Sequence, residues 1–269
     1  MFSGGSTDVQ MRYHDLPGDD TPIVFIHGLG CAGSFDYPEV ASQPCLAGHR
    51  RILVDLVGSG FSDKPTDFDY SIESHARYLD SFLTRIGADS IICYGHSAGG
   101  AVALSLAALR PERIAAIIVA EANLDSGGGF ISCAIASHSQ SEFYDSGFSA
   151  ILANERATGN TTWAASYAVS SPIALYAESM SLIEGVEPSW RQILYKLTCP
   201  KTAIFGARSL PDPDTEELAA HNVEIDIVPN AGHSMAWENP QGLAEAISRN
   251  LTGIPYTRVR CTPPVNLTR

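Results

Sequence analysis

The chain has 269 residues, of which 45% are hydrophobic and 17% are charged, so it can form an apolar core and is neither disordered nor collagen-like. Lys and Arg number 17 against 30 Asp and Glu, and the resulting formal net charge of −13 argues against nucleic acid or an anionic membrane surface as a main partner. The longest aliphatic run, residues 114–120, is far shorter than the roughly 20 residues that span a bilayer. The N-terminus also lacks the apolar stretch of a secretory signal, so we expect a cytoplasmic protein.

Short runs of β-branched and apolar residues recur along the chain, as is typical of buried strands in a parallel sheet. They occupy residues 21–27, 51–55, 90–94, 114–120, 201–207 and 223–228. Residues 98–110 are rich in Ala and Leu and are followed by Pro111, which predicts a helix, and further helices are expected near 216–221 and 240–251. The alternation predicts the α/β class, with a mostly parallel sheet flanked by helices.

Residues 125–199 interrupt this alternation without a clear strand run. The segment is too long for a simple loop and has few charged residues, which predicts a helical cap insertion over an apolar pocket. Its aromatic residues suggest the lining, although some must form the cap's own core: Phe130, Phe143, Phe148, Trp163, Tyr167 and Tyr176. We therefore predict a core of residues 1–124 and 200–252, a cap of 125–199, and an extended or disordered tail of 253–269.

The pentapeptide Gly95-His96-Ser97-Ala98-Gly99 stands between the predicted strand 90–94 and the predicted helix 98–110. In a G-x-S-x-G nucleophile elbow the serine occupies a strained strand-to-helix turn, and small residues two positions away let the strand and the helix approach each other. Clusters of Gly and Ser also occur in ordinary turns, so the pentapeptide alone does not distinguish a nucleophile elbow from a turn without catalytic function. Its place between a strand and a helix favours Ser97 as a nucleophile.

Three more segments follow predicted strands: residues 27–30 (HGLG), residues 55–62 (DLVGSGFS) and Gly232-His233. Together with the elbow they resemble the α/β-hydrolase fold family, over about residues 21–251. The resemblance implies that His233 removes the proton of the Ser97 nucleophile and that the backbone amides of Leu29 and Ala98 form an oxyanion hole.

The other histidines are expected to have different roles. His27 would fix the oxyanion loop through hydrogen bonds, and His96 would point away from the pocket. His138 would have a polar role in the insertion, although contact with substrate is open. The remaining histidines lie in stretches that we expect at the surface: His14, His49, His75 and His221.

The acid of the triad departs from the commonest pattern of the family. Most members carry Asp in the loop after the strand that is 201–207 here, where this chain has Ser209. Asp212 lies just beyond it, and Glu121 directly follows the strand next to the nucleophile strand. Some haloalkane dehalogenases and other members place their acid at that second position. We therefore predict that Glu121 orients His233, with Asp212 as the alternative.

Some patterns have simpler explanations. Residues 28–33 read G-x-G-x-x-G and Asp55 follows, which imitates a dinucleotide-binding fingerprint. Pro38, however, makes a poor start for the helix whose N-terminus would bind the pyrophosphate, so we do not expect a dinucleotide site. Asp214 and Glu217 have the spacing of a capping box. The six cysteines form no C-x-x-C pair, and H-E-x-x-H is absent, so we expect mostly free thiols, no metal and no cofactor.

The sequence thus predicts a serine hydrolase that cleaves a carboxylic ester, or a related acyl bond, of a small and largely apolar substrate through an acyl-enzyme on Ser97. A serine at the elbow argues against the dehalogenase and epoxide hydrolase branches, whose nucleophile is a carboxylate. Two alternatives stay open: a carbon-carbon hydrolase or lyase of the same fold, and a ligand receptor that keeps the triad with negligible turnover. The acyl group, the alcohol and the formation of a homo-oligomer are left undetermined.

Overall fold

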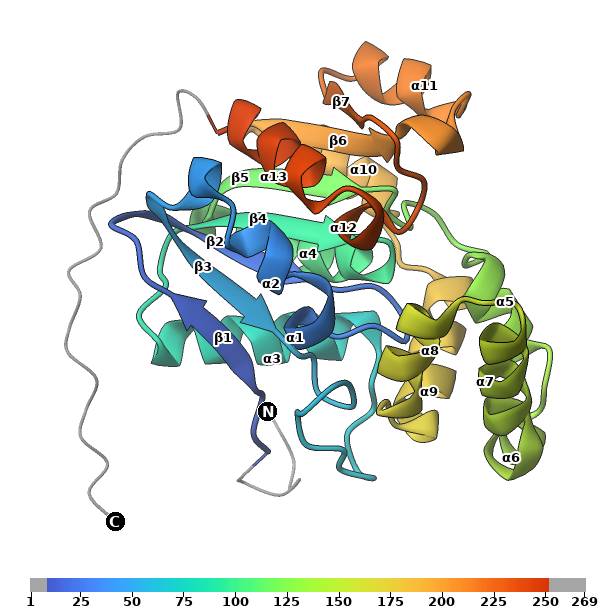
Figure 1. Ribbon diagram of the computed structural model, residues 1–269. Coiled ribbons are helices and arrows are strands. Elements are labelled where there is room, and N and C mark those ends of the chain that lie inside the picture. The colour runs from blue at the N-terminus through green and yellow to red at the C-terminus, as the bar shows by residue number, and fades with distance from the viewer. Residues whose placement is uncertain (1–8, 252–269) are drawn as a thin grey trace.

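A seven-stranded sheet forms the centre of the structure, a computed structural model that describes residues 9–251 (Figure 1). The order across the sheet is β1-β3-β2-β4-β5-β6-β7. The strands are β1 (Tyr13–Leu16), β2 (Asp20–Ile26), β3 (His49–Val54), β4 (Ile91–His96), β5 (Ile114–Ala120), β6 (Lys201–Gly206) and β7 (Glu224–Val228). Only the pairing of β1 with β3 is antiparallel among these strands, so the predicted α/β class with a mostly parallel sheet is confirmed.

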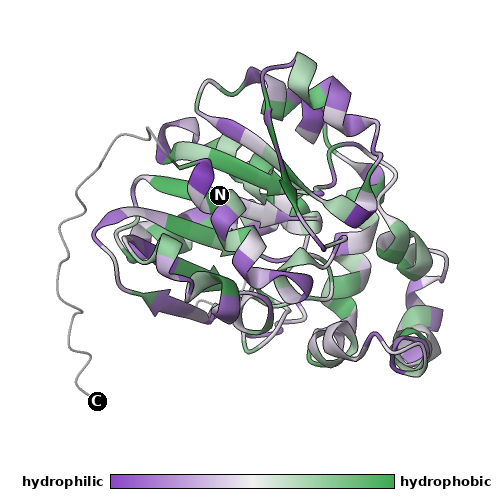
Figure 2. Cartoon of the chain, turned by 45° about the horizontal axis from the view of Figure 1, so that its top comes forward, coloured by the Kyte–Doolittle hydropathy of each residue, from purple (hydrophilic) through white to green (hydrophobic). Residues whose placement is uncertain are grey.

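Helices cover both faces of the sheet. Side chains alternate along each strand, so that Val24 and Ile26 pack in one buried cluster while Ile23 and Phe25 pack in the other. The first cluster includes α3 (Ile72–Arg85) and α4 (Ala98–Leu109), and the second includes α2 (Pro38–Ala41) and α13 (Pro240–Arg249). In Figure 2 the central strands are largely hydrophobic in colour, in agreement with burial on both faces.

The insertion is helical. Its helices are α5 (Phe130–Ala136), α6 (Gln140–Glu142), α7 (Phe148–Ala157), α8 (Thr161–Ala168), α9 (Pro172–Glu184) and α10 (Trp190–Lys196). Helices α5 to α9 lie beyond the carboxyl ends of the parallel strands (Figure 1). Helix α10 returns to the core, where the Trp190 indole N–H donates to the Ser105 hydroxyl of α4 (2.9 Å). The division into core and cap stays a prediction, and the predicted tail 253–269 lies outside the described residues.

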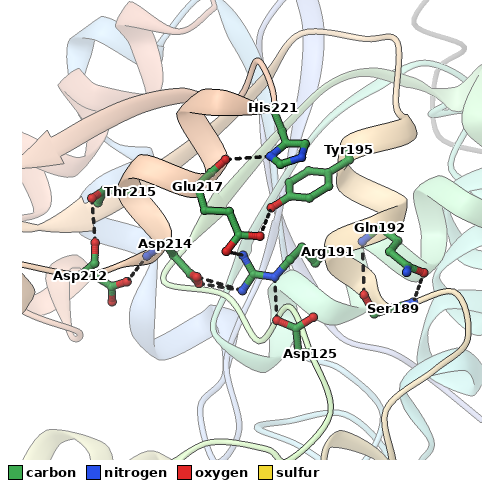
Figure 3. A network of polar contacts seen from close by, with 10 residues as sticks. All are labelled: Asp125, Ser189, Arg191, Gln192, Tyr195, Asp212, Asp214, Thr215, Glu217 and His221. Atoms are coloured by element: carbon green, nitrogen blue, oxygen red, sulfur yellow. Dashed lines mark hydrogen bonds and ion pairs between the residues drawn. The ribbon is translucent and has the colours of Figure 1, made fainter.

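A polar network ties the insertion to α11 (Asp214–Ala220) and corrects one prediction (Figure 3). The Arg191 guanidinium binds Asp125, near the start of the insertion, and Asp214. The predicted capping box is wrong, because α11 begins at Asp214 itself and its N-cap, Pro213, has no side-chain donor or acceptor. The Asp214 carboxylate is used instead to hold Arg191.

Some features bear on partners and chemistry. Within the described part of the chain, no helix is long and apolar enough to cross a membrane, and no group of three or more His, Cys, Asp or Glu is placed to hold a metal ion. The cysteines described there are free thiols, and Cys261 lies outside the described residues.

Candidate active site

Ser97 occupies a strained turn between β4 and α4. Its backbone has φ 52° and ψ −121°, in the left-handed region that residues other than glycine rarely adopt. A Cβ on Gly95 would stand 2.4 Å from the Gly99 carbonyl oxygen, and one on Gly99 would stand 2.4 Å from the His27 carbonyl oxygen. Both glycines are therefore required by close backbone contact, which is the geometry of a nucleophile elbow.

The loop after β2 packs directly against Ser97. A Cβ on Gly28 would stand 3.2 Å from the Ser97 Cβ, and Leu29 lines the same cavity as Ser97. Ala98 is the first residue of α4, so its N–H has no partner within that helix. Leu29 thus follows the glycine that contacts Ser97, and Ala98 directly follows Ser97, while the oxyanion hole that the resemblance assigns to their amides stays a prediction.

His27 holds this loop in place. Its Nδ1 donates to the Gly28 carbonyl (2.9 Å), and its Nε2 accepts from the Leu56 backbone N–H (3.0 Å). Burial lowers the pKa of His27, which keeps the ring neutral with one donor and one acceptor nitrogen. The hydrogen bonds that the sequence predicted for His27 are therefore present.

Glu121 and His233 meet at the same edge of the sheet. His233 Nδ1 donates to Glu121 Oε2 (2.7 Å), while Glu121 Oε1 accepts from the Gly206 N–H (2.9 Å). Burial tends to raise the pKa of Glu121, but hydrogen bonds from His233, Gly206 and Ser209 outweigh it and hold the pKa below its usual value. Glu121 is thus an ionised carboxylate, and the residue at the usual acid position, Ser209, contributes to its stabilisation.

Ser97, His233 and Glu121 all line one cavity of about 500 Å³. Its apolar lining comes from both the core and the insertion, with Leu29 on the core side and Phe130, Trp163 and Leu182 on the other. The predicted aromatics divide between two roles, because Phe130 and Trp163 line the cavity and the others pack together as Phe143, Phe148, Tyr167 and Tyr176. A volume of this size suits a small organic substrate.

The sequence model of the alpha/beta hydrolase fold matches residues 21–169, more than half of the chain. The chain belongs to this family. Among curated relatives of this α/β hydrolase, 2-hydroxy-6-oxo-2,4-heptadienoate hydrolase of Pseudomonas putida is 30% identical over 120 residues, which cover 44% of this chain and 42% of that protein. A haloalkane dehalogenase of Psychrobacter cryohalolentis is 32% identical over 126 residues, covering 45% and 41%. The alignments thus span less than half the length of these relatives.

Solved structures agree over nearly the whole α/β hydrolase. A thermophilic esterase from Thermogutta terrifontis has a TM-score of 0.79 at 19% identity, over 95% of this chain and 97% of that chain. An N-acyl homoserine lactonase complexed with N-hexanoyl homoserine has a TM-score of 0.74 at 17% identity, over 94% and 97%. At these identities the likeness establishes the fold and not the substrate.

The side chain of His96 lies in a different place from the one that the sequence predicted. It was expected to point away from the pocket, but it lines the cavity, and its Nε2 donates to the His233 carbonyl (2.8 Å). Burial and then the neighbouring His233 lower the pKa of His96 to about 3, so its ring stays neutral. His96 therefore braces the loop that carries His233, a role that depends on a residue far along the chain.

His75 also differs from expectation. It was expected at the surface, yet its side chain is 1% exposed and its Nε2 contacts Glu178 Oε1 at 2.9 Å. The pair joins α3 to α9. The surface assignment was wrong because it missed α3, whose buried face carries His75.

The structure also shows the contacts of Asp212, the alternative acid of the triad, and of Asp55, which follows the dinucleotide-like motif. Asp212 Oδ1 accepts a hydrogen bond from the Asp214 backbone N–H (2.8 Å), whereas the His233 Nδ1 bond goes to Glu121. Asp55, the acid of the imitated dinucleotide fingerprint, is buried and accepts from the Ser34 amide and hydroxyl. That carboxylate organises a loop and is not free to bind a ribose.

Proposed function

We propose that this α/β hydrolase is a serine hydrolase that cleaves the carboxylic ester, or a related acyl bond, of a small, uncharged and largely apolar substrate. The observation that carries the proposal is the convergence on one cavity of Ser97, of His233 bonded to Glu121, and of the Leu29 loop. The likeness to solved esterases and to a lactonase supports an acyl bond as the target.

In the proposed reaction, His233 Nε2 takes the proton of Ser97 as the serine oxygen attacks the acyl carbon. The Leu29 and Ala98 amides stabilise the negative charge on the carbonyl oxygen, and Glu121 stabilises the imidazolium. The tetrahedral intermediate collapses, His233 returns its proton to the leaving alcohol, and the acyl group stays on Ser97. Water, deprotonated by His233, then releases the carboxylic acid and restores the serine.

The charge of the cavity favours an ester over the substrate of the curated carbon-carbon hydrolase relative, which is named for a dienoate. Among the described residues that line the cavity there is no Lys or Arg, while Glu121 is ionised. A carboxylate would find no cation to pair with there and would be repelled. An uncharged ester meets no such penalty.

The test compares wild-type protein with Ser97→Ala on short and medium 4-nitrophenyl esters. The proposal expects saturable hydrolysis by the wild type and a loss of several orders of magnitude in the variant, because the acyl-enzyme route is closed. Tight ester binding by the wild type without turnover would indicate a receptor instead. Equal turnover by both proteins would exclude Ser97 as the nucleophile.

A further inference from the structure

Asn123 lies in the active-site cavity, two residues after Glu121 along the chain. Its backbone N–H donates to the Ser97 carbonyl (3.2 Å), and both residues line the cavity. This hydrogen bond joins the segment after β5 to the elbow after β4. Asn123 is therefore held beside the nucleophile by the backbone, whatever its side chain binds.

The side-chain amide of Asn123 is half-buried and has no hydrogen-bond partner among the described residues. Unlike the Tyr94 hydroxyl, which is sealed from water, the amide can be reached by water. Its nitrogen borders open space. A Cβ on Gly129, another residue of the lining, would have Asn123 Nδ2 at 3.5 Å as its only non-adjacent neighbour within 4 Å among the described residues. A hydrogen-bond donor thus faces free volume inside the cavity.

Most other polar side chains of the lining already have partners. The Asn160 amide donates to Glu155 (2.8 Å), and the Trp163 indole N–H donates to the Leu29 carbonyl (3.2 Å). Outside the triad, the Ser234 hydroxyl alone shares with Asn123 access to water and the lack of a partner among the described residues. A hydroxyl rotates and can donate or accept, whereas an amide nitrogen only donates. Of the two, the Asn123 nitrogen is the more selective group.

This donor restricts which substrate groups can cover it. A substrate that fills the cavity removes water from the amide N–H groups, and a methylene at that place leaves them without an acceptor. A carbonyl oxygen replaces the lost water. A carboxylate would also accept, but it would be repelled by the ionised Glu121, and the described lining contains no Lys or Arg. The acceptor that fits is uncharged.

We propose that Asn123 is a specificity-determining residue whose amide nitrogen donates to an uncharged carbonyl oxygen of the substrate, distinct from the carbonyl of the scissile bond. The preferred substrate is then an ester that carries a second carbonyl, as a ketone, an amide or another ester. This inference rests on the proposed function and specifies its substrate class. An analogue with a methylene in place of the second carbonyl leaves the donor unpaired and reacts more slowly.

The experiment uses two pairs of esters that differ only by a carbonyl in place of a methylene. Methyl 5-oxohexanoate against methyl hexanoate tests the acyl chain, and 4-oxopentyl butanoate against pentyl butanoate tests the alcohol. In each pair the ketone is separated from the ester by a chain of methylenes, so the two esters have similar intrinsic reactivity. We measure kcat/KM by pH-stat titration at pH 7 for the wild type and for Asn123→Leu, which keeps a side chain of similar size without polar atoms.

The measured quantity is the ratio of kcat/KM within a pair, ketone over methylene, because a general loss of activity in the variant cancels from it. In one pair the ratio should be about three- to tenfold higher in the wild type than in Asn123→Leu, as expected for one hydrogen bond between uncharged groups. The pair that shows the difference identifies whether the acyl chain or the alcohol reaches Asn123. Equal ratios in the two proteins for both pairs would overturn the proposal.

Two further variants assign the effect to the amide. Asn123→Ala should lower the ratio as Asn123→Leu does, and it replaces that variant if thermal melting shows that Leu impairs folding. Ser234→Ala is the matched control, because it removes the other unpaired polar group of the lining, and it should leave the ratio unchanged. A fall of the ratio in Ser234→Ala as large as that in the Asn123 variants would overturn the assignment.

Binding of the same esters to Ser97→Ala, measured by ligand-observed NMR, separates this inference from the proposed function. If the wild type hydrolyses none of the esters, tighter binding of a ketone ester to Ser97→Ala than to the double variant Ser97→Ala/Asn123→Leu would keep the role of Asn123 and refute the hydrolase. Equal binding to both proteins, or no binding, would overturn the role of Asn123. Turnover with equal ratios would keep the hydrolase and overturn this inference alone.

Discussion

Replacing Glu121 with Gln tests the unusual position of the acid. Besides the hydrogen bond from Ser209, the Glu121 carboxylate accepts from His233 Nδ1 on one oxygen and from the Gly206 N–H on the other. The amide of Gln has a single oxygen, so its NH₂ group must face one of these two donors. If the NH₂ group faces His233, Nδ1 becomes the acceptor and the proton moves to Nε2, which can then no longer take a proton from Ser97.

The expected loss follows from the exposure of the two partners. Removing one member of a buried ion pair costs about 3–5 kcal/mol, and about 1.36 kcal/mol corresponds to a factor of ten in rate. The Glu121 side chain is 11% exposed, but that of His233 is 54% exposed, so water screens part of the interaction. We therefore expect kcat/KM to fall by about 10²–10³, mostly through kcat because the imidazolium forms only during the reaction.

The assay is the hydrolysis of 4-nitrophenyl acetate, with circular dichroism and thermal melting to show that the variant is folded. Asp212→Asn is the matched control, since Asn can still accept from the Asp214 N–H through its side-chain oxygen. It should keep most of the activity. Loss of activity in Asp212→Asn beside nearly normal activity in Glu121→Gln would instead identify Asp212 as the acid of the triad.

The remaining predictions concern Asp36, the elbow and the charge of the substrate. Asp36 has a pKa of about 8 in the folded protein, against an ordinary value of 3.8, so between these pH values the folded state binds more protons than the unfolded state. The free energy of unfolding therefore falls as the pH rises from about 4 to about 8, by at most about 6 kcal/mol. Urea denaturation at pH 5 and pH 8 should show a smaller fall for Asp36→Asn, and an identical fall would contradict the burial argument. Gly95→Ala should lower the free energy of unfolding by about 1–3 kcal/mol, because the added Cβ would stand 2.4 Å from the Gly99 carbonyl oxygen. Gly129→Ala is the control and should change thermal melting little, because its added Cβ would stand 3.5 Å from the nearest atom. A kinetic panel should give 4-nitrophenyl butanoate a kcat/KM about tenfold or more above that of 4-nitrophenyl monosuccinate, and the opposite order would argue against a cavity without cations.

The strands and the elbow could be predicted from the sequence because their signals are local. Runs of β-branched residues mark the buried parallel strands, and the spacing of Gly95 and Gly99 around Ser97 reflects a steric need of the turn itself. The strand β1 was missed because it lies at the edge of the sheet and exposes most of its side chains. The helix α3 was also missed, although its buried Ile72, Ala76, Leu79 and Leu83 have helical spacing.

Side-chain environments that depend on distant residues could not be predicted in this way. His75 is buried and contacts Glu178, while His96 lines the cavity and donates to the His233 carbonyl. Neither partner is close in the sequence. The same holds for the buried carboxyl of Asp36, because the neighbouring Trp237 lies about two hundred residues further along the chain. Pattern and spacing report local geometry, whereas burial of a polar group is decided by the tertiary fold.

Covalent labelling shows whether Ser97 is an activated nucleophile. Wild-type protein is treated with a fluorophosphonate, digested and analysed by mass spectrometry, with Ser97→Ala treated in parallel. We predict one adduct per chain, located on Ser97, together with loss of esterase activity and no adduct in the variant. Full esterase activity in a protein whose Ser97 stays unlabelled, or an inactivating adduct on another residue, would contradict it.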